Sequence, residues 1–399
     1  MNARAARCCF VSDARLSRNG SLVWDGLQNF PKGHWDECLE VFGRVHLVAR
    51  TQSTQGVPNG SPLVPEGVEV GEFPYYVGPL AAAWKSFALL KAARYWARQH
   101  DFFVLRIPGF VPSLVWFFLR RYRKPFAVEV IADSEQIFRV VDHPLKGLWR
   151  RLYGTAQRKM IRGALSVLYV NGGLLKIYPP QRREASVVIS DVRLTDDVFT
   201  RPRTYTTAPN PLRLIQVGNM EQPYKGHEFL LKAVAICVKT PMSLHVTLIG
   251  DGRLRPRFER LALELGLHDV VSFRGAVPWG PRLFEMLDTA DLFLLCSLTE
   301  GLPKALLEAM ARGLPAIGSN VGGIPELLPP EALVPAGNEH ALAAKIISFS
   351  ADLAELSRQS ARNYSEAMKY HHSRLSRARI EFYRRFKSSV DGRTLPQVQ

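Results

Sequence analysis

The 399-residue sequence is poor in cysteine and has no long apolar run. Its five cysteines are odd in number, lie mostly inside apolar stretches and show no metal-ligand spacing, which favours a reducing cytosol over an oxidising compartment. The N-terminus is basic, but it has no apolar run long enough for a signal peptide. The apolar run Pro112–Leu119 is far shorter than the roughly 20 residues that span a membrane. We therefore expect a cytoplasmic protein.

Acidic residues are also scarce: 36 Asp and Glu residues stand against 52 Lys and Arg residues, so the net charge is +16 and the pI is near 9.8. Such a surplus points to an anionic partner, which could be a nucleic acid, a phosphorylated substrate or an anionic membrane. A basic surface without a special partner is the plainer alternative. No recognised nucleic-acid module is present, so we expect no nucleic-acid partner. The ten histidines show no spacing typical of a metal site.

Short apolar runs rich in β-formers alternate with helical periodicity, which predicts βαβ units and parallel sheets. The chain is long enough, and with 47% hydrophobic residues apolar enough, for two domains. A polar stretch with three prolines, Asp191–Arg213, shows no helical period and is the predicted linker. The expected strands are 8–12, 44–50, 102–107, 126–131, 165–170, 185–190, 212–218, 243–250, 270–273, 291–297 and 314–319. The expected helices include 82–99, 144–162, 226–238, 254–265 and 370–387.

The stretch SLTEGLPKALLEAM, Ser297–Met310, carries two glutamates eight positions apart, Glu300 and Glu308. It follows a predicted buried strand, and Pro303 suits the first position of a helix because it lacks an N–H group. Glu300 is thus expected in a loop at the carboxyl end of a strand, where open α/β sheets bind ligands. The N–H groups of Gly301 and Leu302, with those of the first helical turn, predict an anion site.

Glu300 and Glu308 lie close to this predicted anion site, although a carboxylate would repel a bound phosphate. A diphosphate joined to two sugars fits, since N–H groups bind phosphates and carboxylates accept hydrogen bonds from hydroxyl groups. The alternative is that Glu300 caps the helix and that Glu308 is a solvated helix residue.

The longer stretch Glu300–Leu328 resembles the nucleotide-sugar motif of the family 4 retaining glycosyltransferases, which have the GT-B fold. That motif has two glutamates eight apart, a helix ending in Gly-x-Pro, a strand and a Gly-Gly turn. The counterparts here are Glu300, Glu308, Gly313, Pro315, Gly322, Gly323 and Glu326. Further similarity runs through VGNMEQPYKG, LIGDG and VSFRGAVP, from about Leu212 to Pro335. The first half is more divergent, with some likeness to family members that build bacterial surface polysaccharides.

The resemblance implies an α/β fold of two Rossmann-like domains that face each other across a cleft. The acceptor would bind domain 1–195, and the nucleotide sugar would bind domain 210–368. A C-terminal helix, 369–390, would cross back and pack on the first domain. The resemblance implies neither a metal ion nor another cofactor for catalysis.

The resemblance also assigns roles in the second domain. Glu308 would hold the ribose hydroxyls, and Glu300 would lie against the donor sugar. The N–H groups of Gly301 and Leu302 would meet sugar hydroxyls and phosphate at the helix that begins near Pro303. Val277, in RGAVP, would lie near the base.

Lys225, in YKG, would neutralise the departing diphosphate and so stabilise charge separation as the bond to the anomeric carbon breaks. Taken alone, this lysine would be a solvated surface residue. Many family members carry an arginine six positions earlier, where this chain has Asn219, which can bind a phosphate but carries no charge.

Two first-domain residues complete the candidate site. Asp133 follows Ala132 where many family members have a His-Asp pair, and it would contact the donor sugar or the acceptor; alternatively, it caps a helix. Gly20 follows the first strand, where a tight loop would let the backbone approach the donor phosphate or the acceptor; alternatively, it is an ordinary turn.

Two first-domain stretches mix aromatic and basic residues, Ala81–Gln99 and Trp116–Phe126. This mixture suits peripheral contact with an anionic membrane at the inner face of the cytoplasmic membrane. The alternative is that the aromatic side chains belong to the core. We expect a glycosyltransferase that moves a sugar from a nucleoside-diphosphate sugar to a lipid-linked or glycan acceptor. A nucleotide-sugar 2-epimerase and a non-catalytic binding protein of the same fold are the competing classes.

Overall fold

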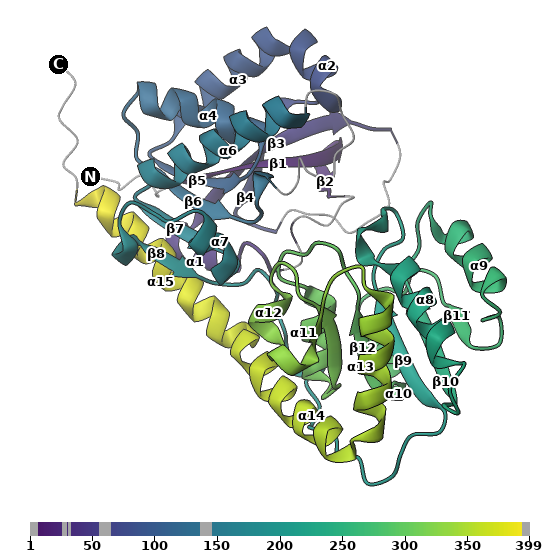
Figure 1. Cartoon of the computed structure of the whole chain (residues 1–399). Helices are drawn as coiled ribbons and strands as arrows, with labels where there is room; N and C mark the ends of the chain where they lie inside the picture. Colours follow the sequence, from purple (N-terminus) through teal and green to yellow (C-terminus); the bar gives the residue numbers. More distant parts are fainter. Residues whose placement is uncertain (1–6, 26–29, 31–32, 56–64, 136–145, 393–399) are drawn as a thin grey trace, which may run out of the picture. The chain divides into compact units, whose positions relative to one another are not determined.

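The computed structural model describes residues 7–25, 30, 33–55, 65–135 and 146–392. The chain divides into two compact units, and each contains one sheet (Figure 1). Unit 1 consists of Met1–Ile189 and Ser376–Gln399, and unit 2 consists of Ser190–Leu375.

Among the described residues, the sheet of unit 1 has eight strands in the order β4-β3-β1-β5-β6-β7-β8, with β2 paired to β1. All pairs are parallel except the β1–β2 hairpin, as expected for βαβ units. The strands are β1 (Arg7–Asn19), β2 (Leu22–Trp24), β3 (Arg44–Ser53), β4 (Val68–Pro74), β5 (Phe102–Ile107), β6 (Ala127–Val130), β7 (Ser166–Tyr169) and β8 (Ser186–Val188).

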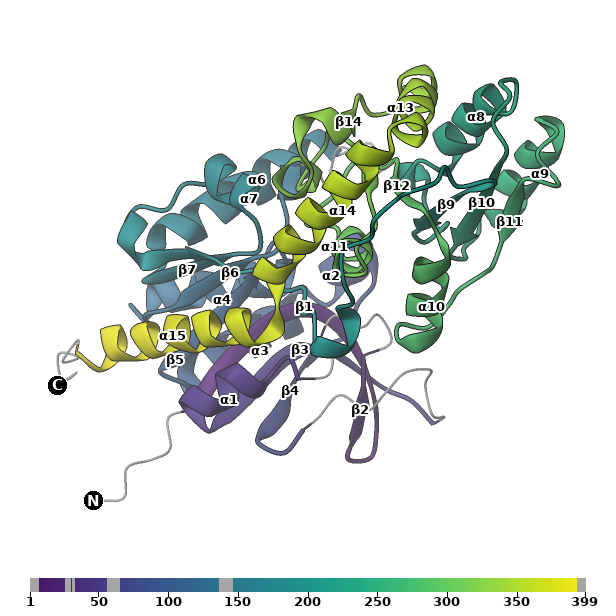
Figure 2. The ribbon, with the colours of Figure 1, turned by 90° about the horizontal axis from the view of Figure 1, so that it is seen from below.

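Helices cover both faces of this sheet. The helices are α1 (Asp36–Phe42), α2 (Gly78–Trp84), α3 (Ser86–Gln99), α4 (Phe110–Arg121), α6 (Lys146–Gly163), α7 (Gly172–Ile177) and the C-terminal α15 (His372–Asp391). Side chains of α3, α4 and α6 share a buried core with alternate residues of the strands, such as Cys9 and Val11. On the other face, Phe10 contacts Trp35 beside α1, and Phe102 of β5 contacts Phe386 of α15. Figure 2 shows α1 and α15 on the same side of the sheet.

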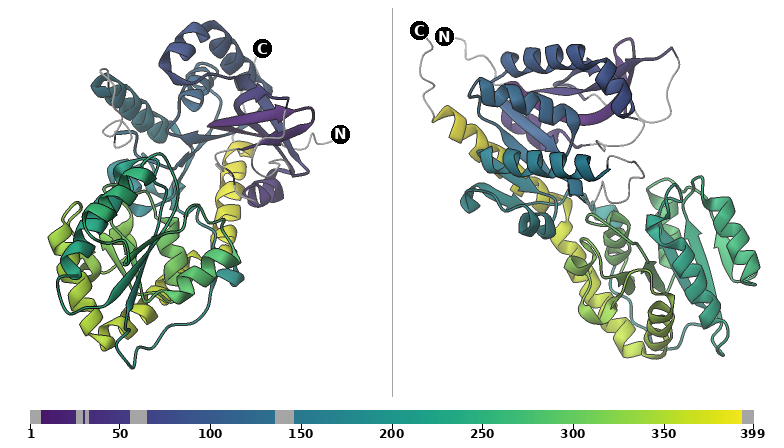
Figure 3. Two further views of the ribbon diagram at one scale, coloured as in Figure 1. Left: turned by 90° about the vertical axis from the view of Figure 1, so that its right-hand side faces the viewer. Right: turned by 45° about the horizontal axis from the view of Figure 1, so that its top comes forward.

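In the part of unit 2 that the structure describes, a six-stranded parallel sheet has the order β11-β10-β9-β12-β13-β14. Its strands are β9 (Leu212–Val217), β10 (Leu244–Ile249), β11 (Val271–Phe273), β12 (Leu292–Leu295), β13 (Ala316–Ser319) and β14 (Leu333–Val334). All residues of β12 and β13 are buried, because helices cover both faces of the sheet (Figure 3). Continuous apolar runs such as LFLL in β12 are the sequence signature of this arrangement.

The helices of unit 2 alternate with its strands. They are α8 (His227–Cys237), α9 (Arg255–Glu264), α10 (Pro281–Thr289), α11 (Lys304–Ala311), α12 (Ile324–Leu327), α13 (Glu339–Ala351) and α14 (Leu353–Ala367). The first part of α15 also lies in unit 2.

The structure corrects three details of the sequence analysis. The single helix expected over 82–99 is two helices, α2 and α3, which meet at Lys85. The expected linker is part of unit 2 rather than a separate segment, because Val192, Leu194 and Val198 are buried in the core of unit 2. Pro303 caps α11 rather than beginning it, since the helix starts at Lys304. No helix among the described residues is long and apolar enough to cross a membrane.

The C-terminal part of α15 is tied into unit 1 by buried polar contacts. Arg379 Nη1 lies 3.2 Å from Glu129 Oε1 of β6, and the Tyr383 hydroxyl donates a 2.7 Å hydrogen bond to the same oxygen. The side chains of Arg379 and Glu129 are 6% and 2% exposed. A carboxylate this deeply buried needs its partners, because an unpaired charge is poorly solvated inside a protein.

The first prediction concerns this ion pair. Arg379→Ala should lower the free energy of unfolding of unit 1 by about 3 to 5 kcal/mol, because it leaves the Glu129 carboxylate buried without its cation. The exposed neighbour Arg377 provides the control, since Arg377→Ala should change that free energy by less than about 0.5 kcal/mol. Urea denaturation followed by circular dichroism measures both. Equal effects of the two substitutions would contradict the role of the pair.

Candidate active site

The candidate site of unit 2 is built on two loops that follow neighbouring parallel strands. One loop leaves β9 and carries Asn219, Tyr224 and Lys225 into α8. The other leaves β12 and carries Ser297 and Glu300 into α11. Because β9 and β12 are paired and parallel, their carboxyl ends lie at the same edge of the sheet. The topology therefore brings the two loops together.

Lys225 and Glu300 form an ion pair at the junction of these loops. Lys225 Nζ lies 2.5 Å from Glu300 Oε1, and the Ser297 hydroxyl donates a 2.7 Å hydrogen bond to the same oxygen. The side chains of Lys225 and Glu300 are 17% and 8% exposed, so water screens the pair little. Glu300 is therefore not a helix cap, because its carboxylate is engaged by the lysine and the serine.

Backbone contacts hold the two loops at close range. Leu298 N donates a 2.7 Å hydrogen bond to the Tyr224 carbonyl. Gly226 has φ 72°, and a Cβ atom there would lie 1.9 Å from the Cys296 carbonyl oxygen. Only glycine allows both this conformation and this approach. The loop that carries Lys225 can therefore lie directly against the loop that carries Glu300.

The Gly-Gly turn after β13 supports the glutamate loop from another side. Gly322 has φ 55°, and a Cβ atom there would lie 1.9 Å from the Glu300 carbonyl oxygen. Gly323 N donates a 2.8 Å hydrogen bond to the Gly301 carbonyl. Gly322 and Gly323 thus fix the backbone that carries Glu300.

Glu308 lies on α11 and is only 4% exposed, which overturns the alternative of a solvated helix residue. Burial raises the pKa of its carboxyl, and the Lys304 ammonium opposes that rise. None of the described residues donates a hydrogen bond to its Oε1 atom, which lies 3.6 Å from Lys304 Nζ. Such an oxygen can accept a hydrogen bond from a ligand hydroxyl group.

Trp279 lies beside this acid and is not among the residues predicted from the sequence. Lys304 Nζ lies 5.3 Å from the centre of the indole ring, whose side chain is 48% exposed. Trp279 is two positions after Val277, which packs partly buried against the core of unit 2. Trp279 directly follows RGAVP in the sequence, and this position could have identified it. A half-exposed indole offers a ring face on which a base can stack.

Asn219 makes short-range contacts within its own loop. Its Nδ2 donates a 3.2 Å hydrogen bond to the Tyr224 hydroxyl, and its Oδ1 accepts a 3.4 Å bond from Glu221 N. Arg253 is held against the same loop, since its Nε donates a 2.9 Å hydrogen bond to the Glu221 carbonyl. Arg253 comes from the loop after β10, and its Nε also lies 3.6 Å from Glu221 Oε1, so the two side chains form an ion pair.

The helix start expected to bind an anion has free donors. Among the described residues, the N–H groups of Gly301 and Leu302 donate no hydrogen bond. The first turn of α11 adds the N–H groups that every helix leaves without an internal partner. These groups can bind an anionic or hydroxyl ligand.

The two candidate residues of unit 1 lie in different loops. Gly20 is exposed in the turn between β1 and β2 with φ 58°. Asp133 follows β6, and its Oδ1 accepts a 2.8 Å hydrogen bond from Glu135 N and another from the Tyr178 hydroxyl. Gln157 of α6 holds the same loop through hydrogen bonds with Ala132 O (2.8 Å) and Ser134 N (3.1 Å). Ser134 and Glu135 are helical, so the hydrogen bond from Glu135 N fits the alternative in which Asp133 caps a helix.

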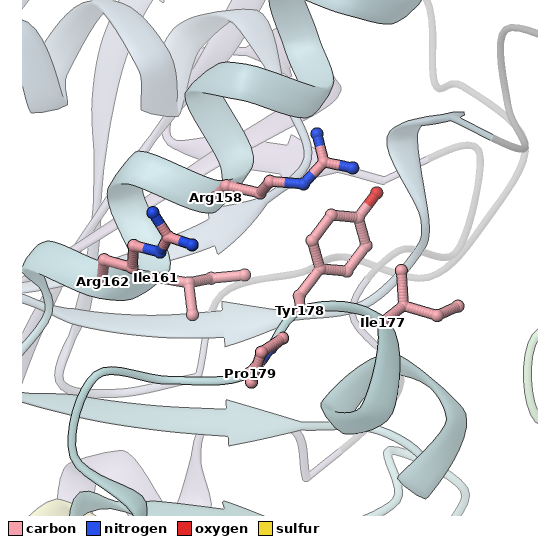
Figure 4. Close-up of a pocket in the computed structure, with 6 residues that line it drawn as sticks. All are labelled: Arg158, Ile161, Arg162, Ile177, Tyr178 and Pro179. Atoms are coloured by element: carbon pink, nitrogen blue, oxygen red, sulfur yellow. The ribbon is translucent and has the colours of Figure 1, made fainter.

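A pocket of about 240 Å³ lies beside the Asp133 contact (Figure 4). Its lining residues are Arg158, Ile161, Arg162, Ile177, Tyr178 and Pro179. The Arg158 guanidinium lies 5.5 Å from the centre of the Tyr178 ring, and it also pairs with Glu135. Tyr178 thus connects the pocket wall to Asp133. In the described part of the chain, no group of three or more His, Cys, Asp and Glu side chains could hold a metal ion.

Comparison with known families agrees with this geometry. Residues 211–352 match the family Glycosyl transferases group 1. Unit 2 therefore contains a domain of the group 1 glycosyl transferases. The colanic acid biosynthesis glycosyltransferase WcaL of Escherichia coli is 34% identical over 158 residues, which cover 37% of this chain and 38% of WcaL. Protein CapJ of Staphylococcus aureus is 23% identical over 303 residues, which cover 72% of this chain and 73% of CapJ.

Solved structures show the fold. Sucrose-phosphate synthase from Thermosynechococcus elongatus is similar with a TM-score of 0.72 at 16% identity, over 96% of this chain and all of that one. Anabaena HepE in complex with UDP-glucose is similar with a TM-score of 0.62 at 16% identity, over 94% of this chain and 99% of that one. The predicted GT-B fold, with two parallel α/β domains, is confirmed.

His227 is the first residue of α8 and lies next to the lysine loop. It is fully buried, and its ring stacks on Phe258 with 5.1 Å between the ring centres. Burial, with the nearby Lys225 ammonium, lowers the pKa of His227 from its ordinary value of 6.5 to about 4. The folded chain therefore keeps this imidazole neutral at pH values where the unfolded chain protonates it.

The second prediction follows from the sign of this shift. Because the unfolded state binds the proton first, the free energy of unfolding should fall as the pH falls from 6.5 to about 4. His227→Gln removes the titrating group, so its unfolding free energy should fall less over that range. Urea denaturation at several pH values measures both proteins. Parallel pH profiles for the wild type and His227→Gln would show that His227 is not the group responsible.

Proposed function

We propose that this chain is a retaining, metal-independent hexosyltransferase of the family 4 type. It moves a sugar from a nucleoside-diphosphate sugar to a glycan or lipid-linked oligosaccharide acceptor during surface polysaccharide biosynthesis. The family match of residues 211–352 and the likeness to WcaL support this assignment. The observation that carries it is the Lys225–Glu300 pair, which lies beside free N–H groups at the start of α11.

In this proposal, the donor diphosphate binds Lys225 and the N–H groups of Gly301 and Leu302, next to Pro303. Glu300 then accepts hydrogen bonds from hydroxyls of the donor sugar. Positive charge at the phosphates favours departure of the nucleoside diphosphate as the bond to the anomeric carbon breaks. The acceptor oxygen forms the new bond to that carbon, and the proton of the acceptor hydroxyl passes to the departing phosphate oxygen of the nucleoside diphosphate. Because the side chains of Lys225 and Glu300 are largely shielded from water, their electrostatic contacts are stronger than they would be in solvent.

The nucleoside end is assigned to α11 and the loop after β11. Glu308 accepts hydrogen bonds from the ribose hydroxyls, for which its buried Oε1 atom is suited, since no described residue donates a hydrogen bond to it. The base lies near Val277, with Trp279 as an aromatic face. Asn219 binds phosphate oxygens, and Arg253 supplies the charge that Asn219 lacks.

Unit 1 takes the acceptor in this proposal. Asp133 contacts the donor sugar or the acceptor, and Gly20 lets the backbone approach one of them. The protein works in the cytoplasm, with peripheral contact at the inner face of the cytoplasmic membrane.

The third prediction tests the reaction and the role of Lys225. Wild-type protein incubated with a panel of labelled nucleotide sugars and a lipid-linked acceptor fraction should release nucleoside diphosphate and transfer the label to that fraction. Lys225→Met should lower this transfer by about 100- to 1,000-fold, because it removes a cation that stabilises the leaving group. Lys239→Met, at an exposed lysine of the same unit, should transfer at the wild-type rate.

Two results would overturn the proposal. Interconversion of nucleotide sugars without transfer would identify an epimerase, and binding without turnover would identify a binding protein. Folding is checked by the thermal unfolding of each variant. Because Lys225→Met leaves Glu300 buried without its cation, Lys225→Met/Glu300→Gln serves as a second, charge-balanced variant. Wild-type turnover by either folded variant would remove Lys225 from the mechanism.

A further inference from the structure

The surface of α2 and α3 exposes large apolar side chains that the sequence alone could not distinguish from core residues. Leu80, Trp84 and Phe87 are 79%, 90% and 80% exposed. Leu90 is 43% exposed on the same stretch. These four residues, with Lys91 and Arg94, are here named the α2–α3 patch. Soluble proteins rarely gather exposed side chains of this size, because each one keeps apolar area in contact with water.

The helical geometry separates this patch from the core of unit 1. Leu89, Ala93 and Ala97 of α3 are buried against the sheet. Phe87 and Leu90 are three positions apart on the opposite face. Figure 1 and Figure 3 show α2 and α3 at the outer margin of unit 1, away from the centre of its sheet. The patch is therefore an outward surface rather than an incompletely packed part of the core.

The charged residues of the segment between Glu72 and Asp101, which contains the patch, are all basic. Residues 73–100 contain no aspartate or glutamate, and their basic residues are Lys85, Lys91, Arg94 and Arg98. Lys91 and Arg94 are exposed, and neither forms an ion pair with a described residue. The neighbouring helix α4 ends with the exposed residues Arg120 and Arg121. A partner that matches the patch therefore combines negative charge with an apolar region.

We propose that the α2–α3 patch docks this chain on an anionic lipid surface. Trp84, Phe87 and the two leucines would enter the interface between headgroups and acyl chains, and Lys91 and Arg94 would contact anionic headgroups. A second copy of this chain fits less well, because a symmetric contact would place the same bases against each other. The proposed function includes a contact with the membrane, and this inference rests on that function because it names the residues that make the contact. Its test is separate, because vesicle binding requires no sugar donor.

The experiment measures sedimentation of the full chain with vesicles. One set contains phosphatidylcholine alone, and the other contains phosphatidylcholine with phosphatidylglycerol, an anionic lipid. The wild type should bind the anionic vesicles at least about tenfold more tightly than the neutral ones, because lysine and arginine are attracted to anionic headgroups. Trp84→Ser/Phe87→Ser should weaken binding to anionic vesicles by about tenfold or more. Lys91→Gln/Arg94→Gln should reduce the preference for anionic vesicles.

Matched substitutions in unit 2 provide the controls. Leu263→Ser replaces an apolar side chain that is 65% exposed on α9, and Lys239→Gln/Arg260→Gln removes two exposed bases. Both variants should bind vesicles as the wild type does. Equal binding by the patch variants and these controls would overturn the proposal. So would a dimer in analytical ultracentrifugation that Trp84→Ser/Phe87→Ser converts to a monomer without any vesicle binding by the wild type.

Thermal unfolding in the presence of nucleoside diphosphates is measured on the same samples. It reports whether unit 2 binds a nucleotide, since a ligand that binds the folded state raises the unfolding temperature. Vesicle binding without a nucleotide effect would contradict the proposed function and leave the docking surface in place. A nucleotide effect without vesicle binding would contradict the docking surface and leave the proposed function in place.

Discussion

The ion pair of Lys225 and Glu300 is the interaction on which the candidate site depends. Both side chains are largely shielded from water, and charges that leave water are stable only when paired. Each residue therefore fixes the other, and together they join the loops that follow β9 and β12. Ser297 completes the arrangement by donating to the same Glu300 oxygen. In the proposed function, the donor diphosphate and the Glu300 carboxylate compete for the Lys225 ammonium group. The ion pair is therefore the arrangement of the site without a donor.

The surrounding backbone is shaped to allow that pairing. Gly226 lies against the Cys296 carbonyl, and Gly322 lies against the Glu300 carbonyl, at distances where no side chain fits. These contacts come from segments far apart in the sequence, and parallel strands bring them to one edge of the sheet. The backbone of both loops is thereby fixed independently of the charged side chains. An exchange of partners, from Glu300 to a phosphate, then requires movement of side chains rather than of the sheet.

Much of the fold could be predicted from the sequence because buried parallel strands have continuous apolar runs, as LFLL in β12 shows. β4 was missed because its sequence, VEVGEFP, alternates apolar and acidic residues at the sheet edge. The positions of Glu300 and Lys225 followed from motif resemblance, but their direct contact did not, since 75 residues separate them in the chain. Nor could the sequence show that Glu308 is buried while Trp84 is exposed, because both lie in helical patterns that fit either environment.

The central claim is that the donor diphosphate replaces Glu300 as the partner of Lys225. Isothermal titration calorimetry of the wild type, Lys225→Met, Glu300→Gln and the double variant tests it, with the nucleoside diphosphate that most raises the unfolding temperature. We expect Glu300→Gln to bind this ligand more tightly than the wild type, because its lysine is already released. Lys225→Met should bind at least about tenfold more weakly, and the double variant should bind no better than Lys225→Met. Unchanged affinity in both single variants would contradict the account.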